Sequence, residues 1–186
     1  MNLQDELGIT FVVVTHDQEE AMTLSTRIAV MNQGRFEQVG PPGEVYEYPR
    51  NRFIADFVGN INLFETTVED WKLGRARLAC EATGAELAAD CKDAPETGSR
   101  SWLAVRPEKI YISKEAPNGN DRSVVKGVVE DLGYFGNLSV FRVRLASGKL
   151  VQVSAQNRVR SATRLVEWED EVYLSWDVTS AILLED

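Results

Sequence analysis

The sequence predicts an α+β fold in which a short mixed segment is followed by a larger, all-β domain of the barrel type. A nearly continuous run of β-branched residues, 9–14, stands directly before a helix start signal. After residue 60 the chain changes to short strands separated by turn residues. The length of 186 residues allows one medium domain or two small ones. We therefore expect two domains, residues 1–60 and residues 61–186.

The composition is that of an ordinary globular protein, with 44% hydrophobic and 26% charged residues. The net charge of −9 repels phosphate backbones, which disfavours non-specific nucleic-acid binding. No apolar run reaches the roughly 20 residues that cross a bilayer, and the N-terminus lacks a secretory signal. A disulfide between Cys80 and Cys91 is possible by count, but we expect two reduced thiols, no bound metal and a soluble, non-exported protein.

The first element, residues 9–14, is expected to be a strand covered on both faces, because it shows no polar alternation. The chain contains no second strand of this type, so the neighbours of this strand must come from elsewhere. Asp17 and Glu20 form a capping pair that predicts a helix over residues 18–26. His16 then lies between a strand end and a helix start, where ligands bind in open α/β sheets. A locally bonded loop histidine is the alternative.

The next elements are expected to be a hairpin and two short helices. Strands 27–31 and 35–39 flank an Asn-Gln-Gly turn signal. Pro42 can occupy the first turn of a short helix, which Pro49 ends. Asn51 could cap the following helix. In that helix, four residues line one face at helical spacing: Phe53, Ile54, Phe57 and Val58.

Three motifs of this first region carry a resemblance to a known family. They are Gly-Ile-Thr-Phe-Val-Val-Val-Thr-His-Asp-Gln-Glu-Glu-Ala-Met, Met-Asn-Gln-Gly-Arg and Val-Tyr-Glu-Tyr-Pro-Arg-Asn-Arg-Phe-Ile-Ala-Asp-Phe-Val-Gly. The run from Gly8 to Gly59 resembles the end of the ATP-binding subunit of an ABC-type importer. The resemblance implies that residues 1–60 are the C-terminal piece of an α/β P-loop ATPase domain. It also implies that His16 is the switch histidine, which contacts the γ-phosphate of ATP in the complete subunit.

The other parts of an ATPase site are missing from the sequence. It contains no Gly-x-x-x-x-Gly-Lys-Ser/Thr loop, no Leu-Ser-Gly-Gly-Gln signature and no apolar strand ending in the Asp-Glu pair that holds Mg²⁺. Phosphoryl transfer depends on these groups for positioning and charge stabilisation. We therefore expect the chain to be inactive alone, with ATP and Mg²⁺ used only by the complete subunit.

The second domain is predicted from its short strands and intervening turns. The expected strands cover residues 63–68, 76–80, 101–106, 109–112, 124–130 and 171–176. A hairpin turn is expected at Ser147-Gly148. A two-residue turn would mix the apolar and polar faces, whereas a three-residue or bulged turn with Gly148 left-handed keeps the apolar faces together. The pairs would then be Leu145 with Val151 and Val143 with Val153.

The second domain carries a resemblance of its own. The motifs Val-Gly-Asn-Ile-Asn-Leu-Phe-Glu, Val-Arg-Pro-Glu-Lys-Ile and Asp-Glu-Val-Tyr-Leu-Ser-Trp occur in this order. Residues 61–186 thereby resemble the transport-associated OB-like (TOBE) regulatory domain of such importers. The second motif and Gly-Asn-Leu-Ser-Val-Phe-Arg-Val-Arg-Leu are most similar to putrescine/spermidine importers. The resemblance implies that the complete subunit powers ATP-driven import of a polyamine, with putrescine as the expected cargo. It also implies a homodimer bound to transmembrane permease subunits on the cytoplasmic face of the inner membrane.

A basic and aromatic stretch keeps another function open. Residues 133–165 contain no Asp or Glu, and their cations are Arg142, Arg144, Lys149, Arg158, Arg160 and Arg164. With the aromatic residues 134, 135 and 141, an OB-like surface could stack bases in a free-standing oligonucleotide- or small-ligand-binding module. The simpler interpretation is that Arg142 and Arg144 form the solvent face of an alternating strand. We favour it, and no nucleic-acid partner, because the chain is acidic.

Overall fold

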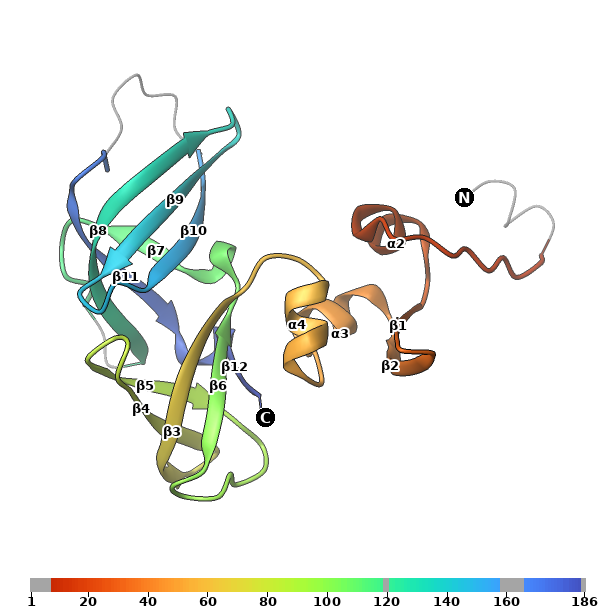
Figure 1. Cartoon of the computed structure of the whole chain (residues 1–186), viewed down its shortest axis with the longest axis horizontal. Helices are drawn as coiled ribbons and strands as arrows, with labels where there is room; N and C mark the ends of the chain where they lie inside the picture. Colours follow the sequence, from red (N-terminus) through yellow and green to blue (C-terminus); the bar gives the residue numbers. More distant parts are fainter. Residues whose placement is uncertain (1–7, 119–120, 158–165, 185–186) are drawn as a thin grey trace. The chain divides into compact units, whose positions relative to one another are not determined.

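The computed structural model describes residues 8–118, 121–157 and 166–184. The chain forms two compact units, Met1–Gly59 and Asn60–Asp186, which are described separately below (Figure 1). The α-helices of the described residues lie in the first unit, and the second consists of strands and two short 3₁₀ helices. This is the predicted α+β class, with an OB-like second part. No helix in the described ranges is long and apolar enough to span a membrane.

The first unit contains three helices and a hairpin. These elements are helix α2 (Gln18–Leu24), strands β1 (Ile28–Asn32) and β2 (Arg35–Gly40), and helices α3 (Pro42–Glu47) and α4 (Arg52–Phe57). Helix α2 begins as predicted, because the side chain of Asp17 accepts a hydrogen bond from the Glu20 N–H at 3.0 Å. Asn51 caps α4 in the same way, accepting from the Ile54 N–H at 2.9 Å. Short polar side chains therefore set both helix starts.

A two-residue turn closes the β1–β2 hairpin. Gln33 and Gly34 have φ angles of 46° and 79°, and a type I′ turn requires positive φ at both central positions. Beneath the hairpin lies a small core whose buried side chains are Val30, Val45, Ile54 and Val58. The buried side chain of Gln38 joins β2 to the segment after α3. It accepts from the Arg50 N–H at 3.0 Å and donates to the Tyr48 carbonyl at 3.1 Å.

The predicted apolar face of α4 is only partly buried. Ile54 and Val58 are buried, together with Ala55. Phe53 and Phe57 remain 38% and 42% exposed and stack on one another, with ring centroids 5.7 Å apart. The helix has only six residues, so it presents one narrow stripe to the core and leaves the two larger rings outside it.

Residues 9–14 do not form the predicted strand. They have no ladder partner among the described residues, and the β1–β2 sheet has only two strands. The exposed fractions of the large apolar side chains in the segment range from 48% at Phe11 to 96% at Val14. A β-branched run becomes a strand only where a neighbouring strand supplies its hydrogen bonds, and the described residues supply none.

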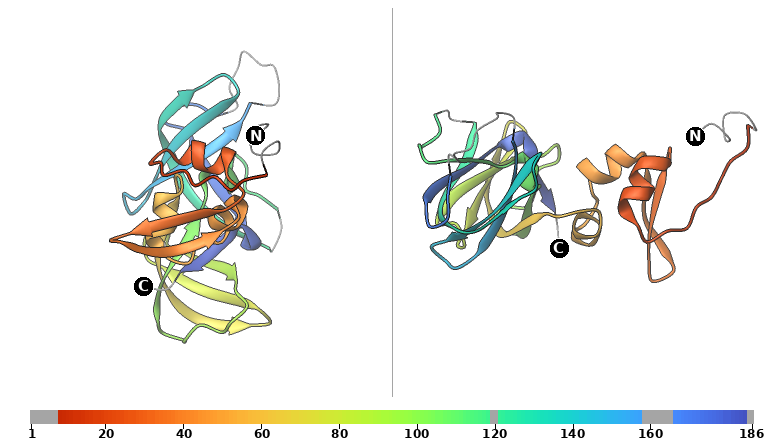
Figure 2. Two further views of the ribbon diagram at one scale, coloured as in Figure 1. Left: turned by 90° about the vertical axis from the view of Figure 1, so that its right-hand side faces the viewer. Right: turned by 90° about the horizontal axis from the view of Figure 1, so that it is seen from above.

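The second unit consists of two five-stranded antiparallel sheets, which curve around a common interior (Figure 2). The first has the order β12-β6-β3-β4-β5. Its strands are β3 (Asn62–Lys72), β4 (Arg75–Cys80), β5 (Ala85–Asp90), β6 (Arg100–Val105) and β12 (Ala181–Leu184). The second has the order β10-β9-β8-β11-β7. Its strands are β7 (Tyr111–Ser113), β8 (Arg122–Tyr134), β9 (Leu138–Leu145), β10 (Leu150–Gln156) and β11 (Glu171–Asp177).

Both sheets contribute side chains to one core. Phe64 of β3 stacks on Trp176 of β11 with ring centroids 5.6 Å apart, and both rings are fully buried. The same core contains leucines and valines of both sheets: Leu78, Leu87 and Leu103 from the first sheet and Val129, Val143 and Leu174 from the second. The two 3₁₀ helices, η1 (Pro107–Lys109) and η2 (Val178–Ser180), connect strands of different sheets.

The β9–β10 hairpin agrees with the sequence prediction in its turn and differs in its register. The turn spans residues 146–148, and Gly148 has the predicted positive φ, 87°. The observed pairs are Val143 with Val151 and Phe141 with Val153, not the predicted Leu145 with Val151 and Val143 with Val153. A shift of two residues keeps every side chain on its face, so the apolar sets still meet.

Side chains from the opposite sheet cover two of the exposed strand edges. β10 lies at the edge of its sheet, and the Asn62 side chain both accepts from the Gln152 N–H and donates to the Gln152 carbonyl, each at 2.8 Å. β5 lies at the edge of the other sheet, where the Ala88 N–H donates to the Ser123 hydroxyl at 3.1 Å. These three backbone groups, which would be unpaired at a sheet edge, are satisfied within the unit.

Candidate functional site

The predicted site residue, His16, follows the exposed segment 9–14 and stands just before α2. The backbone beside it is ordered locally, because the Asp17 N–H donates to the Thr15 hydroxyl at 3.0 Å. The imidazole is exposed and makes no hydrogen bond or ion pair with any residue that the structure describes. An exposed neutral imidazole can donate one hydrogen bond to a phosphate oxygen. The role of His16 stays a prediction.

ATP and Mg²⁺ do not fit the residues of this chain alone. The resemblance found in the sequence implies a nucleotide contact for His16 alone, and the sequence has no phosphate loop. In the described parts of the chain, no group of three or more His, Cys, Asp or Glu side chains is arranged to hold a metal ion. No step of phosphoryl transfer follows from these residues.

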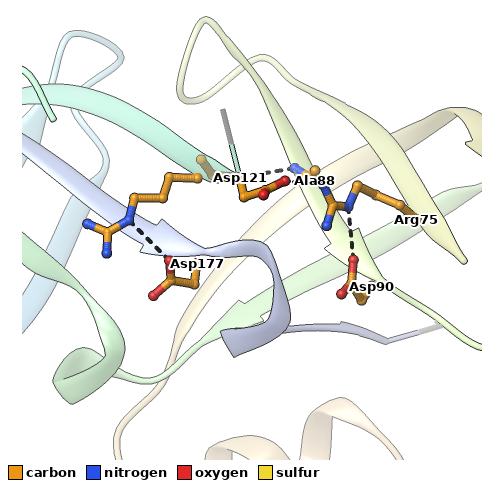
Figure 3. Close-up of polar contacts among 7 residues, drawn as sticks. Arg75, Ala88, Asp90, Asp121 and Asp177 are labelled. Atoms are coloured by element: carbon orange, nitrogen blue, oxygen red, sulfur yellow. Dashed lines mark hydrogen bonds and ion pairs between the residues drawn. The ribbon is translucent and has the colours of Figure 1, made fainter. Parts of the chain in front are cut away.

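A second set of polar side chains lies where β4 and β5 meet the start of β8 and the end of β11 (Figure 3). Arg75 donates through Nε to Asp90 at 3.0 Å and through Nη1 to Asp121 at 2.7 Å. Arg122 donates through Nε to Asp177 at 3.1 Å. The hydrogen bonds that Arg75 donates to Asp121 and then to Asp90 raise its pKa. Arg75 thus links the β4–β5 hairpin to the residue that directly precedes β8 of the other sheet.

Sequence reasoning did not find this arginine–aspartate cluster. The residues are far apart in the chain, and none belongs to a motif with fixed spacing. The contacts of Asn62 and Arg106 were not predicted either, although both residues lie in motifs that carried the family resemblance. Both are buried. The position of Arg106 directly after the apolar end of a predicted strand is the one local signal that could have indicated its burial.

Within β9, the basic stretch considered for nucleic-acid binding forms a solvent face. Arg142 and Arg144 alternate along β9 with buried residues. Arg144 forms an ion pair with Glu130 of β8, and Arg142 lies opposite Asp131 in the ladder. Three other cations of the stretch, Arg158, Arg160 and Arg164, lie outside the described residues. On β9, the arrangement matches the simpler interpretation.

Comparison with known proteins finds relatives along the whole chain. Residues 103–184 match the family model for the TOBE domain. The chain is 39% identical over 186 residues to the spermidine/putrescine import ATP-binding protein PotA of Nitrosospira multiformis, covering 100% of this chain and 51% of that protein. It is 39% identical over 184 residues to the putrescine transport ATP-binding protein PotG of Escherichia coli, covering 99% of this chain and 48% of that protein. The chain therefore spans about half the length of these curated relatives.

A solved structure shares the fold at low sequence identity. The cytoplasmic molybdate-binding protein ModG superposes with a TM-score of 0.59 and 14% identity, covering 67% of this chain and 96% of that one. At this identity the likeness concerns the fold, and it supports an OB-like arrangement of the strands.

Proposed function

We propose that this chain forms the regulatory portion of an ATP-binding subunit of an ABC-type polyamine importer. The chain belongs to the family of these subunits and matches their C-terminal part. Residues 1–60 would be the last piece of the ATPase domain and residues 61–186 the OB-like regulatory domain. The observation that carries the proposal is the match of the whole chain to PotA and PotG at 39% identity.

The complete subunit would use ATP and Mg²⁺ to power polyamine import. We infer putrescine as the cargo, which the name of the PotG relative supports. Two copies of the subunit would assemble with transmembrane permease subunits on the cytoplasmic face of the inner membrane. This arrangement follows from the family and is part of the proposal.

Within the complete subunit, His16 would act as the switch histidine. Its imidazole is exposed and makes no hydrogen bond or ion pair with the described residues, which supports a role in binding a phosphate. Its hydrogen bond would matter most when charge builds on the γ-phosphate. His16→Ala should therefore reduce hydrolysis and leave ATP affinity largely intact.

A chimera tests the proposal. This chain would replace the corresponding C-terminal segment of Escherichia coli PotG, and putrescine uptake would be measured in cells that lack PotG. Uptake should be restored, lost in the chimera with His16→Ala, and kept with Thr23→Ala, an exposed position on α2. A chimera that is expressed and joins the permease but supports no putrescine uptake would contradict the proposal.

A further inference from the structure

A charged groove lies beside Arg75 and Arg122, the two arginines of the arginine–aspartate cluster in the second unit. Its volume is about 380 Å³, which lies within the range of small-molecule sites. Its lining contains more basic than acidic side chains: Lys72, Arg75, Arg77 and Arg122 against Asp70 and Glu86. Asp70 is already engaged by Lys72, whose hydrogen bond lowers the pKa of this carboxyl group.

A second hollow, of about 600 Å³, adjoins the first and shares Lys72 and Arg75 with it. Lys92 adds a third cation to its lining, where Asp90 is the single acid. Each hollow thus has two more cations than acids in its lining, and Arg75 lies at the junction.

The arginines of the groove are held in place and still have donors to offer. Two carboxylates bind Arg75, and its Nη2 donates to no described residue. Arg122 donates through Nε alone, and its guanidinium carbon lies 4.8 Å from the centre of the Tyr111 ring. Asp121, which binds Arg75, and Asp177, which binds Arg122, are not part of the groove lining. Asp90, the second partner of Arg75, lines the adjoining hollow.

Arg77 is the least engaged cation of the groove. Its nearest carboxylate oxygens, on Glu69 and Glu86, lie at 3.5 and 3.6 Å, longer than the roughly 2.7–2.9 Å of a charge-assisted hydrogen bond. Its guanidinium can turn toward a ligand without giving up a strong contact.

We propose that this groove binds a small anion with two linked phosphate groups. Guanidinium forks fit phosphate oxygens in a bidentate manner. The two adjoining hollows share Lys72 and Arg75, and together their lining offers five cations against three acids to an anion that spans them. The chain carries a net charge of −9, so long-range attraction does not assist binding and the affinity must come from these local contacts. The inference does not depend on the proposed transport role.

Calorimetric titration of the 186-residue chain with inorganic pyrophosphate, at constant ionic strength and without Mg²⁺, tests the proposal. Binding should be saturable and about tenfold weaker in Arg77→Gln, the loss of one charge-assisted contact. Arg100→Gln is the matched control, because Arg100 also faces a glutamate, Glu65 at 3.9 Å, and lines neither hollow. It should bind as the unchanged chain does.

Three results would overturn the proposal. One is the absence of saturable binding at millimolar pyrophosphate in a chain with its normal thermal transition. Another is equal affinity in Arg77→Gln and the unchanged chain. The last is binding of spermidine in place of pyrophosphate, abolished by Glu86→Gln, which would make the groove a cation site. Arg77 is about half exposed, so its variant should keep the fold.

Discussion

Arg106 donates a hydrogen bond from its Nη1 atom to the carbonyl oxygen of Asn60 at 3.1 Å, although the two residues are 46 positions apart. Asn60 is the first residue of the second unit, and Gly59 before it has a φ of 105°. Arg106 is only 2% exposed, and a buried charge is tolerated only where hydrogen bonds satisfy it. The contact therefore fixes the point at which the chain enters the β domain.

Replacing Arg106 by methionine should destabilise the second unit. The variant removes a charged donor and leaves the Asn60 carbonyl without this partner, a loss of about 1–3 kcal/mol. Urea unfolding followed by tryptophan fluorescence would measure it. Arg100→Met, at an exposed position, should leave the midpoint almost unchanged, and equal midpoints for the two variants would contradict the expectation.

The isolated chain should neither bind ATP tightly nor hydrolyse it. One histidine cannot replace a phosphate loop and the Mg²⁺ ligands, and the sequence lacks both. Calorimetric titration with Mg-ATP and a phosphate-release assay would check this. Micromolar binding, or turnover that disappears on His16→Ala, would show that the chain contains more of a nucleotide site than we describe.

Residues 60–186 should fold alone, and residues 1–59 should not. The second unit has its own two-sheet core, whereas the apolar segment 9–14 is exposed and unpaired among the described residues. An exposed apolar segment with unpaired backbone groups can pair with the same segment of another chain. The whole chain should therefore associate, most simply as a homodimer. A chain starting at Asn60 should be the more soluble of the two.

Hydrogen exchange combined with light scattering distinguishes the possibilities. The amides of residues 9–14 should exchange fast in any monomer and slowly in the associated chain. Slow exchange across this segment in a sample shown to be monomeric would mean that it has found partners within its own chain.

Asp170 should make part of the stability depend on pH. The hydrogen bond from Lys114 at 2.7 Å, with a further one from the Glu167 N–H, lowers the pKa of this carboxyl in the folded state. A lowered folded pKa adds stability above the unfolded pKa, and that stability is lost as the pH falls below about 4 through the folded value. Urea midpoints measured from neutral to acid pH should decline less in Asp170→Asn than in the unchanged chain.

Asp93→Asn is the matched control, because Asp93 is exposed and makes no ion pair with a described residue. Its urea midpoint should fall with decreasing pH as much as that of the unchanged chain. If Asp170→Asn follows the same curve as Asp93→Asn, the ion pair with Lys114 contributes nothing to acid stability.

Features set by neighbouring residues could be predicted from the sequence. The caps at Asp17 and Asn51 each join a side chain to a backbone N–H three positions ahead, and the Gln33-Gly34 turn needs only its own backbone angles. The β9–β10 register was wrong by two residues because alternation defines a face and not a partner. Local patterns therefore give elements and faces, but not pairings.

The remaining features depend on contacts that the sequence does not show. Strand β5 was not predicted, because its three alanines have weak strand preference; packing of Leu87 and Ala89 in the core stabilises it. The predicted strand at 9–14 needed a neighbour that the described residues lack. The arginine–aspartate cluster joins residues up to 55 positions apart, and no spacing rule connects them. His16 was selected by its place between the predicted strand and α2 and by a motif; the strand is absent, and the role of His16 stays a prediction.

The side chains of Asn62 and Ser123 also limit how another protein can recognise the β domain. A partner that bound by adding its own strand to β10 or β5 would first have to displace the hydrogen bonds at Gln152 and Ala88. The other two edge strands, β7 and β12, have three and four residues, which offers a guest strand few backbone groups. Recognition through side chains on the faces and loops of this domain displaces none of these hydrogen bonds, so its specificity can change by surface substitution while the sheets stay as they are.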